Sequence, residues 1–76
     1  MANLEDWERE APRIIKAAMR RRGITHKMLA KELAKQGIQL EEQSLANKLN
    51  RPSLTFAFAL LVMRALHVDS IEVPKL

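Results

Sequence analysis

Cysteine is absent from the 76-residue chain, which excludes disulfide bonds and metal sites built from thiolates. Aromatic residues are also scarce, with one tryptophan, two phenylalanines and no tyrosine, and none of them lies on a basic face. Recognition of RNA by stacking bases on aromatic rings therefore has little support. The two histidines, His26 and His67, lie at separate ends of expected helices, and we interpret both as surface or capping residues.

The sequence also lacks the residue groupings on which enzymes depend. It contains no carboxylate pair, glycine-rich phosphate loop or nucleophile motif that could act together with either histidine. We therefore expect no catalytic activity, no cofactor, no bound metal and no small-molecule substrate.

No apolar run is long enough to span a bilayer. The longest, residues 56–63, is bounded by Thr55 and Arg64, and its length is that of a core helix. The first ten residues carry four acids instead of a basic segment followed by an apolar one, so no secretory signal is expected. We therefore expect a cytoplasmic protein that does not engage a membrane.

Basic residues are concentrated in the middle of the chain, although the net charge is only +4. Residues 1–12 carry one base and four acids, residues 13–51 carry ten bases and three acids, and residues 52–76 carry two of each. Clustered cations suit a polyanion, because displacement of counterions from phosphates supplies most non-specific binding energy. A merely solvated basic surface is the alternative.

Apolar residues recur at three- and four-residue steps in the first segment, which predicts an amphipathic helix. Asn3 is its expected N-cap and Gly23 its expected end. Pro12 leaves two alternatives, a helix kinked near Glu8 or one that begins near Ala11. The apolar stripe comprises Leu4, Trp7, Ala11, Ile14, Ile15, Ala18 and Met19. This register makes the tryptophan a core or interface anchor.

Three further helices are expected. Thr25 caps a second one, which ends near Gln36 before Gly37, and a connection follows in which Ile38 and Leu40 turn inward. A third begins near residue 41 and stops at residue 51, before Pro52. A fourth, over residues 56–66, is capped by Thr55 and is apolar on all sides, so we expect other helices to surround it. Residues 68–73 predict a short extended arm.

The third helix is expected to have one polar and one apolar face. The polar face spans an arc of about 140° and comprises Gln43, Ser44, Asn47, Lys48 and Arg51. Leu45, Ala46 and Leu49 lie on the opposite side. Amide side chains can bond bidentately to adenine, and Arg and Lys reach guanine or phosphate, so this face has base-reading chemistry. The alternative is the ordinary polarity of an exposed helix face.

Two further sets of cations could accompany that face. On the first helix, a basic ridge falls within an arc of about 60° and comprises Arg9, Arg13, Lys16 and Arg20. Glu5 and Glu10 are spaced to pair with its first two members, which leaves the other two freer. On the second helix, Lys27, Lys31 and Lys35 form a line that can flank a phosphate backbone or be solvated.

These residues resemble the helix-turn-helix domain of the Cro and phage-repressor type, the XRE or lambda repressor-like family. The likeness covers about residues 12–73 and is similar in particular to a small bacterial branch in which an NK-hydrophobic-x-R run precedes a Phe-rich helix. The first motif helix is matched by Ile24-Thr25, Leu29-Ala30 and Leu33, the recognition helix by residues 44–51, and the closing helix by Leu54-Thr55, Ala65-Leu66 and Val68.

The resemblance implies a role for each matching residue. Thr25 would hold a helix N-terminus near the DNA backbone, Lys27, Lys16 and Arg20 would lie at its flank, and the third helix would enter the major groove. Within that helix the groove-facing residues would be Gln43, Ser44, Asn47 and Lys48, with Arg51 on a phosphate.

Three features differ from the family pattern. The turn between Leu33 and Leu45 is longer, Glu41 and Glu42 stand where small polar or basic residues are usual, and His67 replaces a glycine at the end of the closing helix.

Together these patterns predict an all-α, compact four- to five-helix lambda repressor-like domain over residues 1–76, with residues 1–11 extending the first helix and residues 68–76 forming an arm. We expect it to bind duplex DNA as a transcriptional regulator, and to form a homodimer that spans two half-sites. The alternative is a protein-interaction module of the same fold, an antitoxin or complex subunit, in which the two acids weaken or abolish DNA binding.

Overall fold

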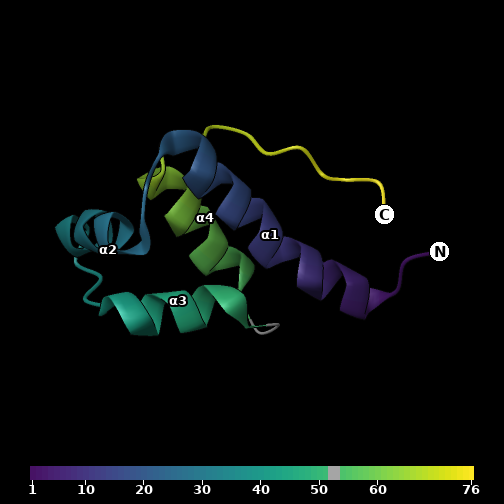
Figure 1. The fold of residues 1–76 in the computed structure, drawn as a ribbon, viewed down its shortest axis with the longest axis horizontal. Coiled ribbons are helices and arrows are strands. Elements are labelled where there is room, and N and C mark those ends of the chain that lie inside the picture. Colours follow the sequence, from purple (N-terminus) through teal and green to yellow (C-terminus); the bar gives the residue numbers. More distant parts are fainter. Residues whose placement is uncertain (52–53) are drawn as a thin grey trace.

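The computed structural model describes residues 1–51 and 54–76, and these residues form four α-helices without a β-strand. The helices are α1 (Leu4–Arg22), α2 (His26–Lys35), α3 (Glu42–Asn50) and α4 (Phe56–Ala65). α1 and α4 lie one behind the other, with α2 at one end of them and α3 along one side (Figure 1). The all-helical, compact architecture expected from the sequence is confirmed. Pro52, which we expected to end the third helix, lies outside the described residues.

α1 begins at Leu4, so the alternative start near Ala11 is wrong. A capping box fixes this end: the Asn3 side chain accepts a hydrogen bond from the Asp6 backbone N–H, and the Asp6 carboxylate accepts one from the Asn3 N–H. Pro12 lies inside the helix, where it removes one backbone donor without ending the helix. The cap and the packed second half of α1 support the helix on both sides of the proline.

α1 and α4 end in the same way. Gly23 has a positive φ of 64°, and the N–H of Ile24 donates to the carbonyl of Met19 at 2.9 Å. His67 has a φ of 60°, and the N–H of Val68 donates to the carbonyl of Met63 at 2.9 Å. Both are Schellman-type ends, so the histidine takes the left-handed conformation that glycine adopts at lower cost.

The remaining helix ends are close to those expected. The Thr25 hydroxyl accepts from the Met28 N–H and the Thr55 hydroxyl accepts from the Phe58 N–H, as N-caps do. α2 ends at Lys35 and α3 at Asn50, each one residue earlier than predicted, a difference within the usual uncertainty of helix ends.

All four helices contribute to one core. Its buried members are Ile15, Ala18, Met19, Leu29, Leu33, Leu45, Leu49, Val62, Met63, Ala65 and Leu66. Ile38 and Leu40, from the connection between α2 and α3, pack against it as predicted. The prediction that α4 is surrounded on all sides is wrong, because Phe56 and Leu60 are exposed. α1 and α2 pack on α4 and cover only part of its circumference.

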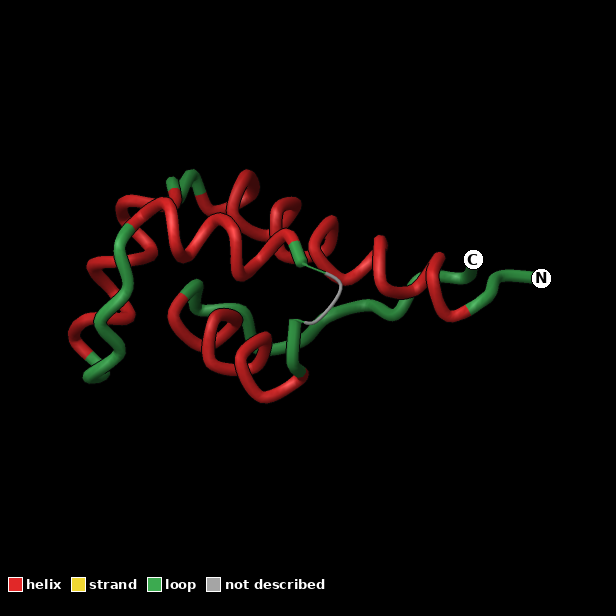
Figure 2. Tube along the Cα trace, turned by 90° about the horizontal axis from the view of Figure 1, so that it is seen from below, coloured by secondary structure: helices red, strands yellow, loops and turns green. Residues whose placement is uncertain are grey.

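Residues 68–76 form an arm without regular secondary structure. The arm turns back after α4 and runs along α1, so that the two chain ends lie near each other in both views (Figures 1 and 2). Two contacts fix its start: the Arg22 guanidinium donates to the carbonyl of His67 at 2.8 Å, and Arg64 lies 3.6 Å from the carboxylate of Asp69. The expected arm is therefore present, and it is anchored to both α1 and α4.

Candidate nucleic-acid interface

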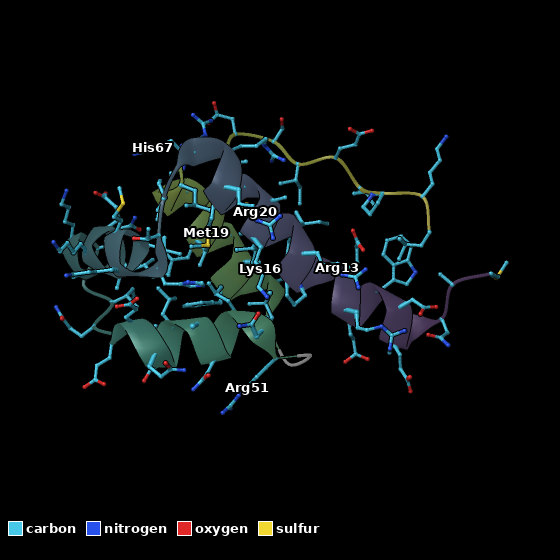
Figure 3. The ribbon with its side chains drawn as sticks, viewed as in Figure 1. Arg13, Lys16, Met19, Arg20, Arg51 and His67 are labelled. Carbon is cyan, nitrogen blue, oxygen red and sulfur yellow. The ribbon has the colours of Figure 1, made fainter. Side chains whose placement is uncertain are left out.

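α3 has the two-faced character expected from the sequence. Leu45 and Leu49 are fully buried in the core. The opposite side is exposed along its length and comprises Gln43, Ser44, Asn47, Lys48, Asn50 and Arg51. No other part of the described chain covers this polar face. Figure 3 shows Arg51 extending from the end of α3 away from the rest of the molecule.

The amide side chains on this face are partly oriented by one another. The Gln43 side-chain NH₂ donates to the side-chain oxygen of Asn47 at 3.2 Å, one helical turn apart. Asn47 keeps its own NH₂ group free for a ligand, and Gln43 keeps its carbonyl oxygen. Asn50, which our sequence analysis left out, donates to the backbone carbonyl of Ala46 at 2.8 Å. At 100° per residue Asn50 lies only about 20° beyond the edge of the polar arc, so the sequence could have indicated that it belongs to this face.

Lys48 turns toward α4 instead of extending straight outward. Its ammonium lies 4.9 Å from the centre of the Phe58 ring, within the range of a cation–π interaction. This side of α3 borders a groove of about 320 Å³, lined by Ser44, Asn47, Lys48, Arg51, Leu54 and Thr55. The structure therefore brings four of the predicted base-reading and phosphate-binding residues together at one groove. It leaves Gln43 outside that groove, next to Asn47.

A second groove, of about 550 Å³, lies between α1, the start of α2 and the start of α3. Lys16 and Arg20 contribute two cations to it, and Figure 3 shows both on the same side of α1. Thr25 and Glu42 also line this groove. Neither cation forms an ion pair with another described residue. The first-helix cations that the sequence singled out therefore lie beside the N-terminus of α2, where a phosphate is favoured by both charge and helix dipole.

His26 lies in the same groove, and sequence reasoning missed this placement. Its Nε2 atom is buried and has no hydrogen-bond partner in the described structure. As the first residue of α2, directly after the Thr25 cap, it was expected to be a surface or capping residue. Its place in the groove depends on how α1 and the start of α3 lie around the first turn of α2, which no sequence pattern predicts.

The N-terminal part of the basic ridge is already paired. Arg9 bonds to Asp6, where we had expected Glu5, and Arg13 lies 3.7 Å from Glu10 as predicted. The pKa of Asp6 is lowered below its ordinary value, first because its carboxylate accepts the Asn3 backbone N–H and then because Arg9 lies beside it. The ridge thus divides into two paired cations on the projecting end of α1 and two unpaired ones at the groove.

The line of lysines on α2 is exposed but belongs to neither groove. Lys27 and Lys31 have no ion-pair partner among the described residues, and Lys35 bonds to Glu32 at 3.0 Å. The hydroxyl of Thr25 is engaged in capping α2, which fits a residue that holds the helix end in place. Of the three lysines, Lys27 is nearest in sequence to this cap.

The acidic residues before α3 remain exposed. Six residues, 36–41, connect α2 to α3, against three to four in a typical helix-turn-helix. Glu41 is the N-cap residue of α3 but its side chain makes no capping hydrogen bond, and Glu42 opens the helix. These two carboxylates place negative charge at the N-terminal end of α3, which opposes the binding of an anion there.

Among residues 1–51 and 54–76, no group of three or more His, Asp or Glu side chains is arranged to hold a metal ion. In the same residues, no helix combines the length and apolarity needed to cross a membrane.

These features define an all-helical domain that carries a polar helix face between two grooves. Residues 7–71 match a family described as a domain of unknown function, DUF6471, and because this match covers most of the chain, the protein belongs to that family. No curated protein and no solved structure matches the chain. The matched segment contains α2, α3 and α4 entirely, together with both grooves.

Proposed function

We propose that this domain binds duplex DNA as a lambda repressor-like helix-turn-helix domain of the Cro and phage-repressor type, with α3 as its recognition helix. The observation that carries the proposal is the exposure of one continuous face of amides, a hydroxyl and cations on a helix whose other face is fixed by the buried Leu45 and Leu49. An α-helix fits the major groove of B-DNA, and such a face supplies the groups that read base edges there.

Each side chain of this face has a suitable role. Asn47 and Gln43 present amides that can bond bidentately to adenine, and their mutual hydrogen bond limits the number of rotamers lost on binding. Ser44 is a short donor and acceptor. Arg51, at the C-terminal end of α3, can reach a phosphate or a guanine. Lys48 contributes positive charge from the groove beside α4.

The second groove supports a contact with the DNA backbone. Lys16 and Arg20 approach the N-terminus of α2, which Thr25 caps, and Lys27 lies in the first turn of that helix. Backbone contacts of this kind set the orientation of a recognition helix without reading sequence. The domain would act as a transcriptional regulator, and as a homodimer it would engage two half-sites about 34 Å apart.

A second candidate function is a protein-interaction module of the same fold, such as an antitoxin or a complex subunit. Two observations favour it: Glu41 and Glu42 are exposed at the start of α3, and α4 exposes Phe56 and Leu60. In this case the polar face of α3 would be an ordinary solvated surface.

Selection from a random duplex library, followed by a salt titration with the selected site, separates the two functions. We expect a motif to be enriched and the affinity to fall steeply with salt, because each neutralised phosphate releases counterions. Arg51→Ala and Lys48→Ala should each reduce the salt slope by about 1. Lys75→Ala, which removes the same charge from the arm, is the matched control and should leave the slope unchanged.

A folded protein that enriches no motif and shows no salt-dependent binding to any duplex would contradict DNA binding and favour the interaction module. Retention of helicity in each variant, measured by circular dichroism, ensures that a lost signal reflects the removed side chain.

A further inference from the structure

The first half of α1 projects beyond the other helices. The buried residues of α1 are Pro12, Ile15, Ala18 and Met19, all of which lie in the middle or second half of the helix. The molecule measures 40 × 22 × 19 Å, and the N-terminal end of α1, purple in Figure 1, extends past α3 and α4 in both views (Figures 1 and 2). The helices of this chain therefore support only the second half of α1.

This projecting half nevertheless continues the apolar stripe of the helix. Leu4 is 74% exposed and Trp7 is 38% exposed, and with Ala11 they occupy the same helical face as the buried Ile15 and Ala18. The arm packs on a neighbouring side of α1, against Glu10, Arg13 and Arg21, and its Leu76 borders Asp6 and Arg9 in the projecting half. An amphipathic helix gains its stability in a protein by covering its apolar face, and here the arm shields Trp7 only in part and leaves Leu4 exposed.

α4 presents a second apolar surface. Phe56 is 73% exposed and Leu60 is 53% exposed, and their spacing of four residues places them on one side of the helix. Exposed Arg64 follows one turn later on the same side. Large apolar side chains gathered on two adjacent helices form the kind of exposed surface that marks a protein contact.

We propose that a second copy of this chain docks on these two surfaces, so that the projecting half of α1 from each copy lies across α4 of the other. This inference rests on the proposed function, which includes a homodimer, and it names the surfaces through which the two copies make contact. α1 and α4 run in the same general direction in both views. A two-fold axis at right angles to α1 therefore makes α1 antiparallel to the α4 of the second copy. The same α1–α4 contact then forms twice, once from each copy.

Charge is consistent with this pairing. Residues 1–12 carry four acids and one base, and the one charged residue of α4 is Arg64. The antiparallel arrangement sets Trp7 against Leu60 and brings the Leu4 end of α1 to the Arg64 end of α4. Glu5, next to Leu4, then approaches the Arg64 of the second copy, which also lies 3.6 Å from the Asp69 carboxylate of its own chain. Such a rim contact sets orientation more than affinity.

The area available is sufficient for a weak to moderate dimer. With about 200 Å² for each large apolar side chain, the exposed parts of Leu4, Trp7, Phe56 and Leu60 amount to roughly 500 Å² per copy and about 1,000 Å² for two. This is close to the smallest area that distinguishes specific interfaces from incidental contacts. An interface of this size is expected to be reversible, so the dimer should dissociate on dilution.

Sedimentation velocity of the full chain over a range of concentrations tests the proposal without DNA. We expect a monomer–dimer equilibrium in which Leu4→Glu and Leu60→Glu each raise the dissociation constant at least tenfold. Val73→Glu introduces the same charge at an equally exposed apolar position on the arm, 70% exposed, and should leave the constant within twofold of the parent value. A chain that remains monomeric throughout, or one in which only Val73→Glu acts, overturns the proposal.

Disulfide trapping tests the arrangement itself, since the chain has no cysteine of its own. One copy carries Trp7→Cys, the other carries Leu60→Cys, and the two are mixed and oxidised mildly. The mixed disulfide should form much faster than one between Trp7→Cys and Val73→Cys copies. Equal rates for the two mixtures contradict the antiparallel contact, even if a dimer is present.

The outcomes for the interface and for DNA binding are separable. A monomer that still enriches a duplex motif overturns the proposed contact alone. A dimer broken by Leu60→Glu that binds no duplex overturns the proposed function alone.

Discussion

α3 and α4 are neighbouring helices of nearly equal length that expose opposite chemistry. Both bury leucine or valine side chains in the same core, yet α3 turns amides and cations outward while α4 leaves Phe56 and Leu60 uncovered. The comparison shows that the core requires only one face of each helix. The second face of each helix is then free for binding, and we propose that it binds a polyanion on α3 and a protein surface on α4.

The largest expected effect concerns the buried faces. Leu49→Ala on α3 should lower the free energy of unfolding by about 2–5 kcal/mol, because it leaves a cavity in the shared core. Leu60→Ala on α4 should change it by less than about 0.5 kcal/mol, as is usual for an exposed side chain. Urea unfolding at a concentration low enough to keep the chain monomeric measures both. Equal losses of unfolding free energy in the two variants would contradict a buried Leu49 and an exposed Leu60.

The next largest effect concerns DNA affinity, which should depend on the exposed face of α3 but not on that of α4. Asn47→Ala should weaken binding to the selected duplex by about 1–3 kcal/mol and relax the base preference at one position, because a bidentate amide contact is lost. Arg64→Ala, on the exposed side of α4, removes a charge and should leave DNA affinity almost unchanged. Fluorescence anisotropy with matched and mismatched duplexes distinguishes them. An Arg64→Ala protein as weak as Asn47→Ala would place the DNA surface elsewhere.

The N-caps of the two helices offer a comparison of about 1 kcal/mol. Thr55→Ala should destabilise the protein by that amount, because the Phe58 N–H loses its acceptor. Glu41→Ser should stabilise it by up to a similar amount, since α3 has no side-chain cap, and it should also tighten DNA binding by removing an acid. Thermal melting and anisotropy report the two effects separately. Stabilisation without tighter binding would mean that Glu41 does not face phosphate.

The smallest expected effect is at the end of α4. His67→Gly should raise the free energy of unfolding by about 0.5 kcal/mol, because glycine adopts the left-handed conformation with less strain but loses more freedom on folding. Gly23→Ala, at the equivalent end of α1, should lower it by about 1 kcal/mol. Urea unfolding of both variants provides the test. A destabilised His67→Gly protein would indicate that the imidazole itself contributes to the cap.

The helices and their ends were predictable because they depend on short stretches of sequence. Asn3, Thr25 and Thr55 cap the helices that follow them, and Gly23 ends α1, as the local hydrogen-bonding capacity of these residues requires. The polar and apolar sides of α3 follow in the same way from a period of 3.6 residues. The sequence left open whether the first helix kinks before Pro12 or begins near it. Local patterns could not decide this, because a helix tolerates a proline when both of its halves are supported.

Features that depend on contacts between helices were not predictable. The sequence indicated that α4 is enclosed, but periodicity cannot state how many neighbours a helix has. It also could not show that Lys48 turns to Phe58, or that Lys16, Arg20 and His26 share a groove. Each of these depends on the angle and distance between elements that are remote in the chain.

The positions of the helices, their caps and the polar side of α3 follow from the amino-acid sequence, because these properties arise from hydrogen bonds and spacing within a few turns. Which apolar side chains stay outside the core depends on how the helices pack together. Two helices packed on part of the surface of α4 cannot cover it completely, and a first helix longer than its supports must project from them.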